Sequence, residues 1–281
     1  MIESKSLATA RITFIGGGNM ATAMLGGLIK ATGSSDKYCV VEPIESQREH
    51  IQSSYQVITL APDQAIPICD VIVLAVKPQQ MRPIIENLGR LCQPWLANTL
   101  IISIAAGVLI QSLSDWLGGH QRIIRAMPNT PALVGMGIAG LASQFVQNDT
   151  DKTLSLAILE SVGKAIWFDS ERDLDSVTAL SGSGPAYVFH FLEVMQASGI
   201  KMGLSADTAR QLAIETFSGA AQLARQSPLP LSNLREQVTS KGGTTAAALN
   251  AMNAEHLDEI FSRALFAAKD RATQLAKGDV P

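Results

Sequence analysis

Arg11–Ala21, with the sequence RITFIGGGNMA, is the stretch that decides how this chain folds. It opens with β-branched and aromatic residues typical of a buried strand, and the strand pattern stops at three consecutive glycines. From Asn19 to Lys30 helix formers follow, with Met20, Met24, Leu25 and Leu28 at helical spacing. A strand, a glycine turn and a helix in direct succession predict the start of a βαβ unit.

The glycine turn carries the pattern G-x-G-x-x-A. Gly16 permits the tight turn, Gly18 lets a phosphate approach the backbone, and Ala21 keeps the helix close to the sheet. A purely structural turn is the alternative, but the position after a strand and before a helix favours dinucleotide binding. The residues predicted to bind the cofactor here are Gly16, Gly17, Gly18, Asn19, Met20 and Ala21.

Apolar runs that resemble strands recur at 38–41, 71–76, 100–104 and 122–127. The run at 71–76, VIVLAV, is apolar throughout, as in strands buried on both faces. Helical stretches separate these runs, so we predict a mostly parallel sheet of the Rossmann type with right-handed crossovers. Ligands bind beyond the carboxyl ends of such strands, where small residues leave room for a nicotinamide, although simple loop punctuation is the alternative. The residues concerned are Ala75, Val76, Lys77, Pro78, Ala105 and Ala106.

Glu42 ends the second strand-like run, where an acidic side chain accepts hydrogen bonds from the adenosine ribose hydroxyls. Its charge would repel a 2′-phosphate, which favours NAD over NADP. Arg48 would offset that repulsion if its side chain folded back. A solvated strand end is the alternative interpretation of Glu42.

The chain changes character near residue 170, after which long Ala/Leu/Met stretches replace the strand-like runs. We therefore expect a dinucleotide-binding domain over 1–170 and an all-helical domain over 171–281. Apolar residues between Leu257 and Leu275 recur at helical spacing and predict one apolar stripe on a helix. Ser205 is predicted to be the N-cap of an earlier helix. The sequence Ser181–Tyr187, SGSGPAY, is expected to be a loop at the junction between the domains.

Hydrophobic residues make up 47% of the 281 residues and charged residues only 17%, which indicates self-association. A net charge of −3 argues against a nucleic-acid partner. Three widely spaced cysteines without a CxxC pair, and histidines without metal spacing, predict reduced thiols and no metal site. With no signal-peptide core and no apolar run long enough to cross a bilayer, we expect a cytoplasmic protein without a membrane partner.

A second candidate site lies in Val238–Met252, VTSKGGTTAAALNAM. Its glycine pair exposes backbone N–H groups, and the helix that follows adds unpaired N–H groups and a partial positive charge. Such a turn is a socket for a small anion, a carboxylate or a phosphate. It stands far along the chain from the first glycine turn, so we expect the two to bind different groups.

Taken together, these motifs resemble those of the pyrroline-5-carboxylate reductases, which catalyse the last step of proline synthesis. The resemblance runs nearly end to end through IGGGNMA, AVKP, SIAAG, RAMPNTPA, SGSGPAY and VTSKGGTTAAAL. It implies reduction of the cyclic imine by NADPH or NADH without a metal, in a homodimer joined by C-terminal helices, often five dimers to a ring.

The resemblance also implies roles for particular residues. The stretch 127–130, with Asn129, would close the nicotinamide side of the cofactor site, and Thr245 would be the catalytic residue that reaches the ring nitrogen. The substrate carboxylate would be bound by the loop Ser240, Gly242, Gly243 and Thr244.

Two departures from the family pattern are Lys241, where the family commonly has Pro, and Glu42, where a small hydroxyl residue is often found.

Two other functions compete with this interpretation. A β-hydroxyacid dehydrogenase would need a Lys on the first helix of the helical domain, and Thr178–Gly199 has none. A non-catalytic dinucleotide sensor would have no use for a second anion socket.

Overall fold

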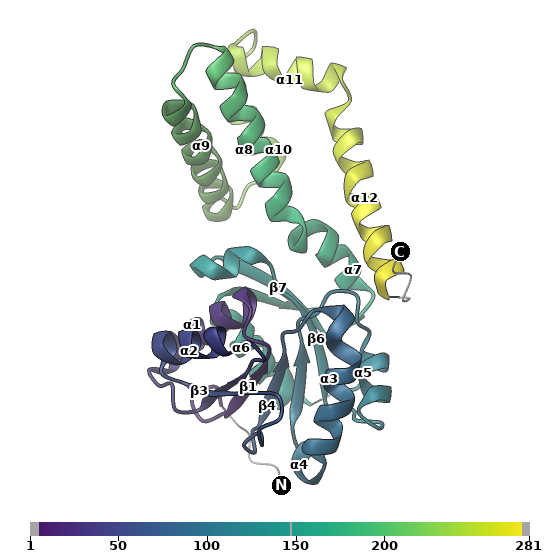
Figure 1. The fold of residues 1–281 in the computed structure, drawn as a ribbon. Coiled ribbons are helices and arrows are strands. Elements are labelled where there is room, and N and C mark those ends of the chain that lie inside the picture. The colour runs from purple at the N-terminus through teal and green to yellow at the C-terminus, as the bar shows by residue number, and fades with distance from the viewer. Residues whose placement is uncertain (1–5, 147, 277–281) are drawn as a thin grey trace. The chain divides into compact units, whose positions relative to one another are not determined.

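The chain forms two compact units by its contacts, residues 1–183 with 268–281 and residues 184–267. The computed structural model (Figure 1) describes residues 6–146 and 148–276, without the side chains of Gln93 and Pro94. The expectation of no signal peptide falls partly on residues 1–5, which lie outside the described residues.

The first unit is built on one eight-stranded sheet with the order β3-β2-β1-β4-β5-β6-β7-β8. Five strands confirm the predicted runs: β1 (Ile12–Ile15), β2 (Tyr38–Val41), β4 (Val71–Leu74), β5 (Leu100–Ser103) and β6 (Ile123–Met127). The sequence did not indicate β3 (Ile58–Leu60), β7 (Gly137–Ala142) or β8 (Gly163–Trp167). Among the strands of the described residues, β6 and β7 alone pair antiparallel, so the prediction of a mostly parallel sheet is confirmed.

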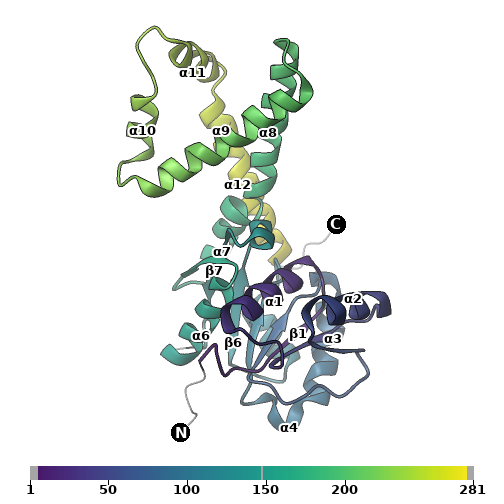
Figure 2. The ribbon, with the colours of Figure 1, turned by 90° about the vertical axis from the view of Figure 1, so that its left-hand side faces the viewer.

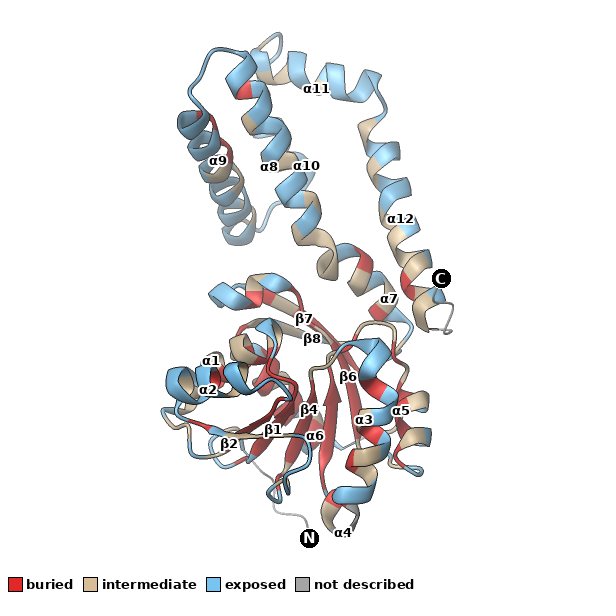
Figure 3. Cartoon of the chain, viewed as in Figure 1, coloured by how far each residue is buried: buried red, intermediate tan, exposed pale blue. Residues whose placement is uncertain are grey.

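Helices cover both faces of this sheet, because the buried strands present apolar side chains on alternate sides. Ile12 and Phe14 pack with α1 (Asn19–Thr32), α2 (Glu45–Tyr55) and α6 (Asp149–Glu160). On the other face, Ile72 and Leu74 pack with α3 (Pro78–Leu91), α4 (Gln93–Leu96) and α5 (Ile110–Trp116). Figure 3 shows the strands as the most continuously buried part of this unit.

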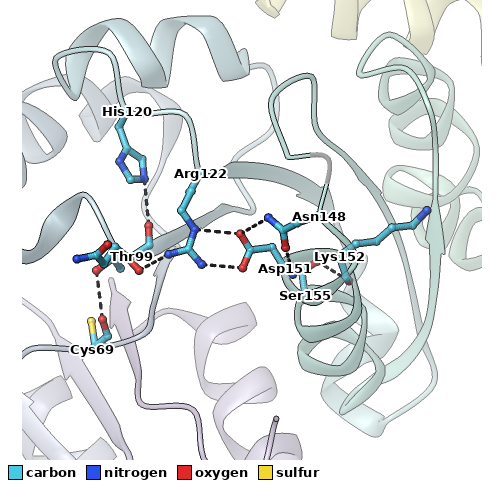
Figure 4. Close-up of polar contacts among 9 residues, drawn as sticks. Cys69, Thr99, His120, Arg122, Asn148, Asp151, Lys152 and Ser155 are labelled. Carbon is cyan, nitrogen blue, oxygen red and sulfur yellow. Dashed lines mark hydrogen bonds and ion pairs between the residues drawn. The ribbon is translucent and has the colours of Figure 1, made fainter. Parts of the chain in front are cut away.

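An ion pair between the half-buried Arg122 and the buried Asp151 fixes α6 beside the start of β6 (Figure 4). Arg122 donates to both carboxylate oxygens of Asp151, at 2.7 and 3.0 Å, and also to the carbonyl of Asn98. Asn148, the N-cap of α6, accepts from the Asp151 N–H. Burial alone would raise the Asp151 pKa, but hydrogen bonds from Arg122 and Asn148 outweigh it and leave that pKa lowered. The pair therefore stabilises the fold with Asp151 ionised.

Helical structure is continuous around the predicted interdomain loop. The elements η1 (Thr130–Val134), α7 (Asp173–Val177) and the π-helical η2 (Thr178–Gly182) belong to the first unit. Ser181 and Gly182 are thus part of a π-helix, not of a loop, and Ser183 N donates to the Thr178 carbonyl at 2.8 Å. Hydroxyl-to-backbone bonds from Thr178 and Ser181, to the carbonyls four residues earlier, accompany this turn.

In the second unit, the described residues form helices joined by turns, with no strand among them (Figure 2). Its elements are α8 (Gly184–Lys201), α9 (Ala206–Gln226), α10 (Leu231–Gln237), α11 (Thr244–Ala254) and α12 (Leu257–Ala276), the last of which continues into the first unit. Ser205 accepts from the Thr208 N–H, which confirms it as the N-cap of α9. Phe191 of α8 contacts the rings of Phe217 and Phe261.

Candidate functional site

The first glycine turn joins β1 to α1 and lies against the ends of two neighbouring strands. Gly16 has φ of +100°, and a Cβ there would lie 2.7 Å from the Ala75 carbonyl oxygen. Its N–H donates to the Val41 carbonyl at 2.8 Å. Only glycine tolerates both the positive φ and the close approach, so the turn can be as tight as the sequence predicted.

Gly17 is held on both of its backbone groups by side chains that follow β2. Its N–H donates to Glu42 Oε2 at 2.9 Å, and its carbonyl accepts from Gln47 Nε2 at 2.9 Å. The other carboxylate oxygen of Glu42 accepts from Ile44 N at 3.0 Å. Gln47 was not anticipated, because a glutamine in the first turns of a helix carries no signal of its own. These bonds fix the middle of the turn against the segment that follows β2.

Glu42 is buried, with 8% of its surface exposed, at the carboxyl end of β2. Each carboxylate oxygen already accepts one backbone N–H and can accept a further hydrogen bond. Arg48 folds back as the sequence allowed, but its Nη1 donates to the main-chain carbonyls of Glu42 and Pro43, both at 2.8 Å. The guanidinium is thus fixed beside position 42 through the backbone.

Gly18 is the open side of the turn. It is the N-cap of α1 and has no side-chain cap, and nothing lies within 4 Å of where its Cβ would be. The N–H groups of the first helical turn have no partners within the helix, and Gly18 and Asn19 are exposed. Together with the helix dipole, this geometry fits a pyrophosphate.

The predicted nicotinamide side consists of the ends of β4 and β5. These strands are parallel neighbours, with Leu74 paired to Ser103, so the residues after them meet at the same edge of the sheet. Ala75 and Val76 are half-buried, whereas Lys77 and Pro78 begin α3 at the surface. On the β5 side, Ala105 is buried and Ala106 is half-buried. The structure therefore brings the small residues of both loops together.

Asn129 follows β6 and is buried, with 8% exposed. Its Nδ2 donates to the Ser181 carbonyl at 3.1 Å, and its Oδ1 accepts from Ile138 N at 2.9 Å. The side-chain amide therefore connects three segments of the first unit. A contact of this residue with a cofactor would have to accommodate those two bonds.

The second glycine turn precedes α11 in the second unit. Gly242 has φ of +73°, and Gly243 N donates to the Ser240 carbonyl at 3.1 Å. Gly243 is the N-cap of α11 without a side-chain cap, and a Cβ on it would lie 2.5 Å from Ser240 Oγ. Lys241 is exposed and Thr245 is half-buried. The structure thus has the uncapped start of an 11-residue helix behind a bare glycine, the geometry on which the predicted anion socket depends. Anion binding there stays a prediction.

Comparison with known proteins relates this chain to one enzyme family. The model of the pyrroline-5-carboxylate reductase dimerisation domain matches residues 171–275, and that of NADP oxidoreductase, coenzyme F420-dependent, matches residues 11–107. Pyrroline-5-carboxylate reductase of Pseudomonas aeruginosa is 39% identical over 96% of this chain and 98% of its own length. This chain belongs to the pyrroline-5-carboxylate reductase family. The enzyme of Haemophilus influenzae is 40% identical over 94% of this chain and 97% of its own length.

Solved structures of pyrroline-5-carboxylate reductases share the whole fold. The enzyme from Coxiella burnetii superposes with a TM-score of 0.88 at 38% identity, over 95% of this chain and 99% of that one. A Plasmodium falciparum pyrroline carboxylate reductase with NADP bound superposes with a TM-score of 0.83 at 29% identity, over 96% and 99%. As a member of this family, the chain is an NAD(P)H-dependent oxidoreductase that reduces pyrroline-5-carboxylate, and its helical part is a dimerisation domain.

Within 6–146 and 148–276, no group of three or more His, Cys, Asp or Glu side chains could hold a metal ion. Over the same residues, no helix is both long and apolar enough to cross a membrane.

Proposed function

We propose that the two glycine turns of this pyrroline-5-carboxylate reductase bind different molecules, the dinucleotide and the substrate. The observation that carries the proposal is the uncapped N-terminus of α11 behind Gly243, in the unit that does not contain the dinucleotide turn. The backbone N–H of Thr244 and the hydroxyl of Ser240 bind the substrate carboxylate there. Gly242 and Gly243 leave room for its close approach, while the Gly243 N–H holds the turn through the Ser240 carbonyl. Residues 171–281 thus form the substrate and dimerisation domain, and 1–170 the cofactor domain.

The cofactor lies along the ends of the first strands. Gly16 to Ala21 hold its pyrophosphate, and Glu42 accepts from the adenosine ribose. The nicotinamide is lined by Ala75 to Pro78, Ala105 and Ala106, and Asn129 closes that side. The carboxylate of Glu42, anchored by two backbone N–H groups, favours NADH over NADPH in this chain.

The reaction asks for positioning more than for acid–base chemistry. The bound dinucleotide supplies a hydride to the carbon of the protonated C=N bond, and the ring nitrogen becomes the amine of L-proline. Thr245 hydrogen-bonds this nitrogen and selects the face of the ring, while the anion socket fixes its distance. Holding the reacting atoms at near-attack distance accounts for a large share of such a rate enhancement.

Thr245→Ala tests the assignment. We expect kcat/KM for pyrroline-5-carboxylate to fall by about one to two orders of magnitude, through loss of a hydrogen bond and of orientation. The assay follows loss of NAD(P)H absorbance. Thr153→Ala, an exposed position on α6, is the matched control. Unchanged kinetics of Thr245→Ala would remove this hydroxyl from the mechanism, and turnover of a β-keto acid in place of the imine would overturn the substrate.

The proposed function extends to how the chains assemble and where the enzyme works. We expect the dimer to be the building block of a higher oligomer, a decamer of five dimers, in the cytoplasm. The apolar surface left exposed on the helical unit supports assembly beyond a single chain.

A further inference from the structure

The last turns of α12 belong to the unit that contains the sheet. Residues 268–281 group with residues 1–183 by their contacts, although the helix begins in the other unit. Two residues of this segment lie close to the loop between β5 and α5. Leu275 lies against Gly107 of that loop, and Thr273 bonds to Asp175, which is linked to the start of α5. That loop carries Ala105 and Ala106, which we have assigned to the nicotinamide.

Leu275 touches the loop directly. Gly107 has φ of +73°, and a Cβ there would lie 2.9 Å from Leu275 Cβ and 3.3 Å from the Leu275 carbonyl carbon. The end of α12 therefore packs on the bare backbone of the loop, one residue after Ala106. A side chain at position 107 would push the two apart, so the absence of a Cβ sets this contact.

Thr273 reaches the other end of the loop through a chain of polar contacts. Its hydroxyl donates to Asp175 Oδ2 at 2.8 Å, with the Lys269 carbonyl as a second acceptor at 3.2 Å. Asp175 Oδ1 lies 3.8 Å from Arg125 Nη2. Arg125 Nη1 donates to Glu171 Oε1 at 3.1 Å, and the same oxygen accepts from Ile110 N at 2.9 Å. Ile110 is the first residue of α5, directly after the loop.

Burial makes this chain of contacts stiff. The Arg125 side chain is 1% exposed and its two carboxylate partners are each 13% exposed. Among the described residues, Arg125 Nη2 has no hydrogen-bond partner, so its charge depends on the nearby Asp175. Moving Asp175 would leave a buried cation poorly compensated, which is costly. Asp175 is in turn bonded to Thr273.

We propose that residues 268–276 are a positioning element for the nicotinamide loop, with Thr273 and Leu275 as its positioning residues. Contact at Gly107 and the chain ending at Ile110 fix the loop from both ends. This inference rests on the proposed placement of the nicotinamide at Ala105 and Ala106. It gives the final helix of the dimerisation domain a second role, in aligning the hydride donor.

The test is the double variant Thr273→Val with Leu275→Gly, because the Leu275 side-chain atom nearest Gly107 is its Cβ, which alanine would retain. Because a shift of the loop by about 1 Å misaligns the hydride transfer, we expect kcat to fall by about tenfold or more. The primary deuterium isotope effect with C4-deuterated NADH should rise as the hydride step becomes limiting. The Kd of ADP-ribose should stay within about twofold of wild type, since the glycine turn is untouched. Thr153→Val with Leu91→Gly, both exposed positions, is the matched control, since Leu91 likewise lies in the last turn of its helix.

A wild-type kcat and isotope effect in the double variant would overturn the proposal, even if its Tm fell. So would a loss of kcat that accompanied dissociation of the dimer in sedimentation experiments. If the double variant does not fold, Thr273→Ser and Thr273→Val decide. The serine should retain wild-type kinetics and the valine should not, and equal kinetics in both would reject the role of the hydroxyl. Failure of the wild type to reduce the imine would instead reject the proposed function.

Discussion

Glu42 shows how one residue serves both the fold and the site. Its carboxylate accepts from Gly17 N and Ile44 N, so it braces the turn before any cofactor binds. In the proposed placement of the cofactor, the same carboxylate would lie beside the 2′-phosphate of NADPH and repel it. Arg48, bonded to the carbonyls of residues 42 and 43, is the nearby cation that limits this repulsion.

Replacing Glu42 with Ser should therefore shift the cofactor preference. We expect the ratio of kcat/KM with NADPH to that with NADH to rise by about tenfold, because a like charge is removed. The absolute kcat/KM with NADH should fall, since the two backbone N–H groups lose their acceptor. Steady-state assays with both cofactors measure the ratio. Glu49→Ser, an exposed position on the neighbouring helix α2, should leave it unchanged. A ratio equal to that of wild type would mean that Glu42 does not face the ribose.

At the scale of elements, a strand could be recognised in the sequence where it is both buried and rich in large apolar residues. β1, β2, β4 and β5 are buried along their whole length and appear as mainly apolar runs, with Thr13 and Ser103 as their polar residues. β3 is a three-residue edge strand with exposed and half-buried residues. The Gly/Ala-rich β7 has few β-branched residues, and β8 alternates half-buried and exposed residues. Pairing with a neighbour, not intrinsic propensity, makes these last segments strands.

The attachment of α6 to β6 depends on the buried pair of Arg122 and Asp151. Arg122→Met should lower the free energy of unfolding by about 3 kcal/mol, because it leaves a buried carboxylate unpaired. Urea denaturation measures this. Arg82→Met, which breaks an exposed pair with Glu86 on α3, should cost less than about 0.5 kcal/mol. Equal losses in the two variants would show that the buried pair contributes nothing special.

The pH dependence of stability follows from the same pair. The Asp151 pKa lies below its ordinary value of 3.8 in the folded protein, so its stabilisation is present above that value. It is lost as the pH falls through the lowered folded pKa, because the unfolded state then binds the proton more readily. We expect Asp151→Asn to lose less stability than wild type between pH 5 and the acid transition, measured by urea denaturation at each pH.

At the scale of the whole molecule, the helical unit leaves its apolar residues without cover. The residues of the predicted apolar stripe all lie on the helix α12, but within the part described by the structure only Ala272 of that helix is buried. Large apolar side chains are exposed across the unit, with Phe189 at 64% and Phe266 at 63%. Apolar surface of this extent is typical of an interface between subunits, as expected of a dimerisation domain.

Sedimentation of the purified protein should give a mass of two chains or a multiple of two at micromolar concentration. Phe266→Glu should shift the distribution toward smaller species and lower Tm, because a charge would be buried in the interface. Leu91→Glu, an exposed apolar position on α3 in the other unit, is the control. A wild-type protein that sediments as a monomer would contradict this expectation.

The sequence by itself determined what depends on neighbours along the chain. These features are the strand–turn–helix with its glycines, the buried parallel strands, the helical texture after residue 170, and the glycine pair before α11. Local steric constraints and hydrophobic periodicity determine all of these features, so each can be recognised in a short stretch of sequence.

Only the tertiary structure decided which distant groups meet. In the fold, Gln47 donates to the Gly17 carbonyl, and Leu275 packs against Gly107. The side-chain amide of Asn129 bonds to the backbone of Ser181 and Ile138. The tertiary structure also turned the expected loop at Ser181 into a π-helix. Each of these contacts joins segments whose pairing depends on how the whole chain packs and on which polar groups become buried together. No local pattern encodes that, because the free energy of such a contact exists only once both partners have been withdrawn from water.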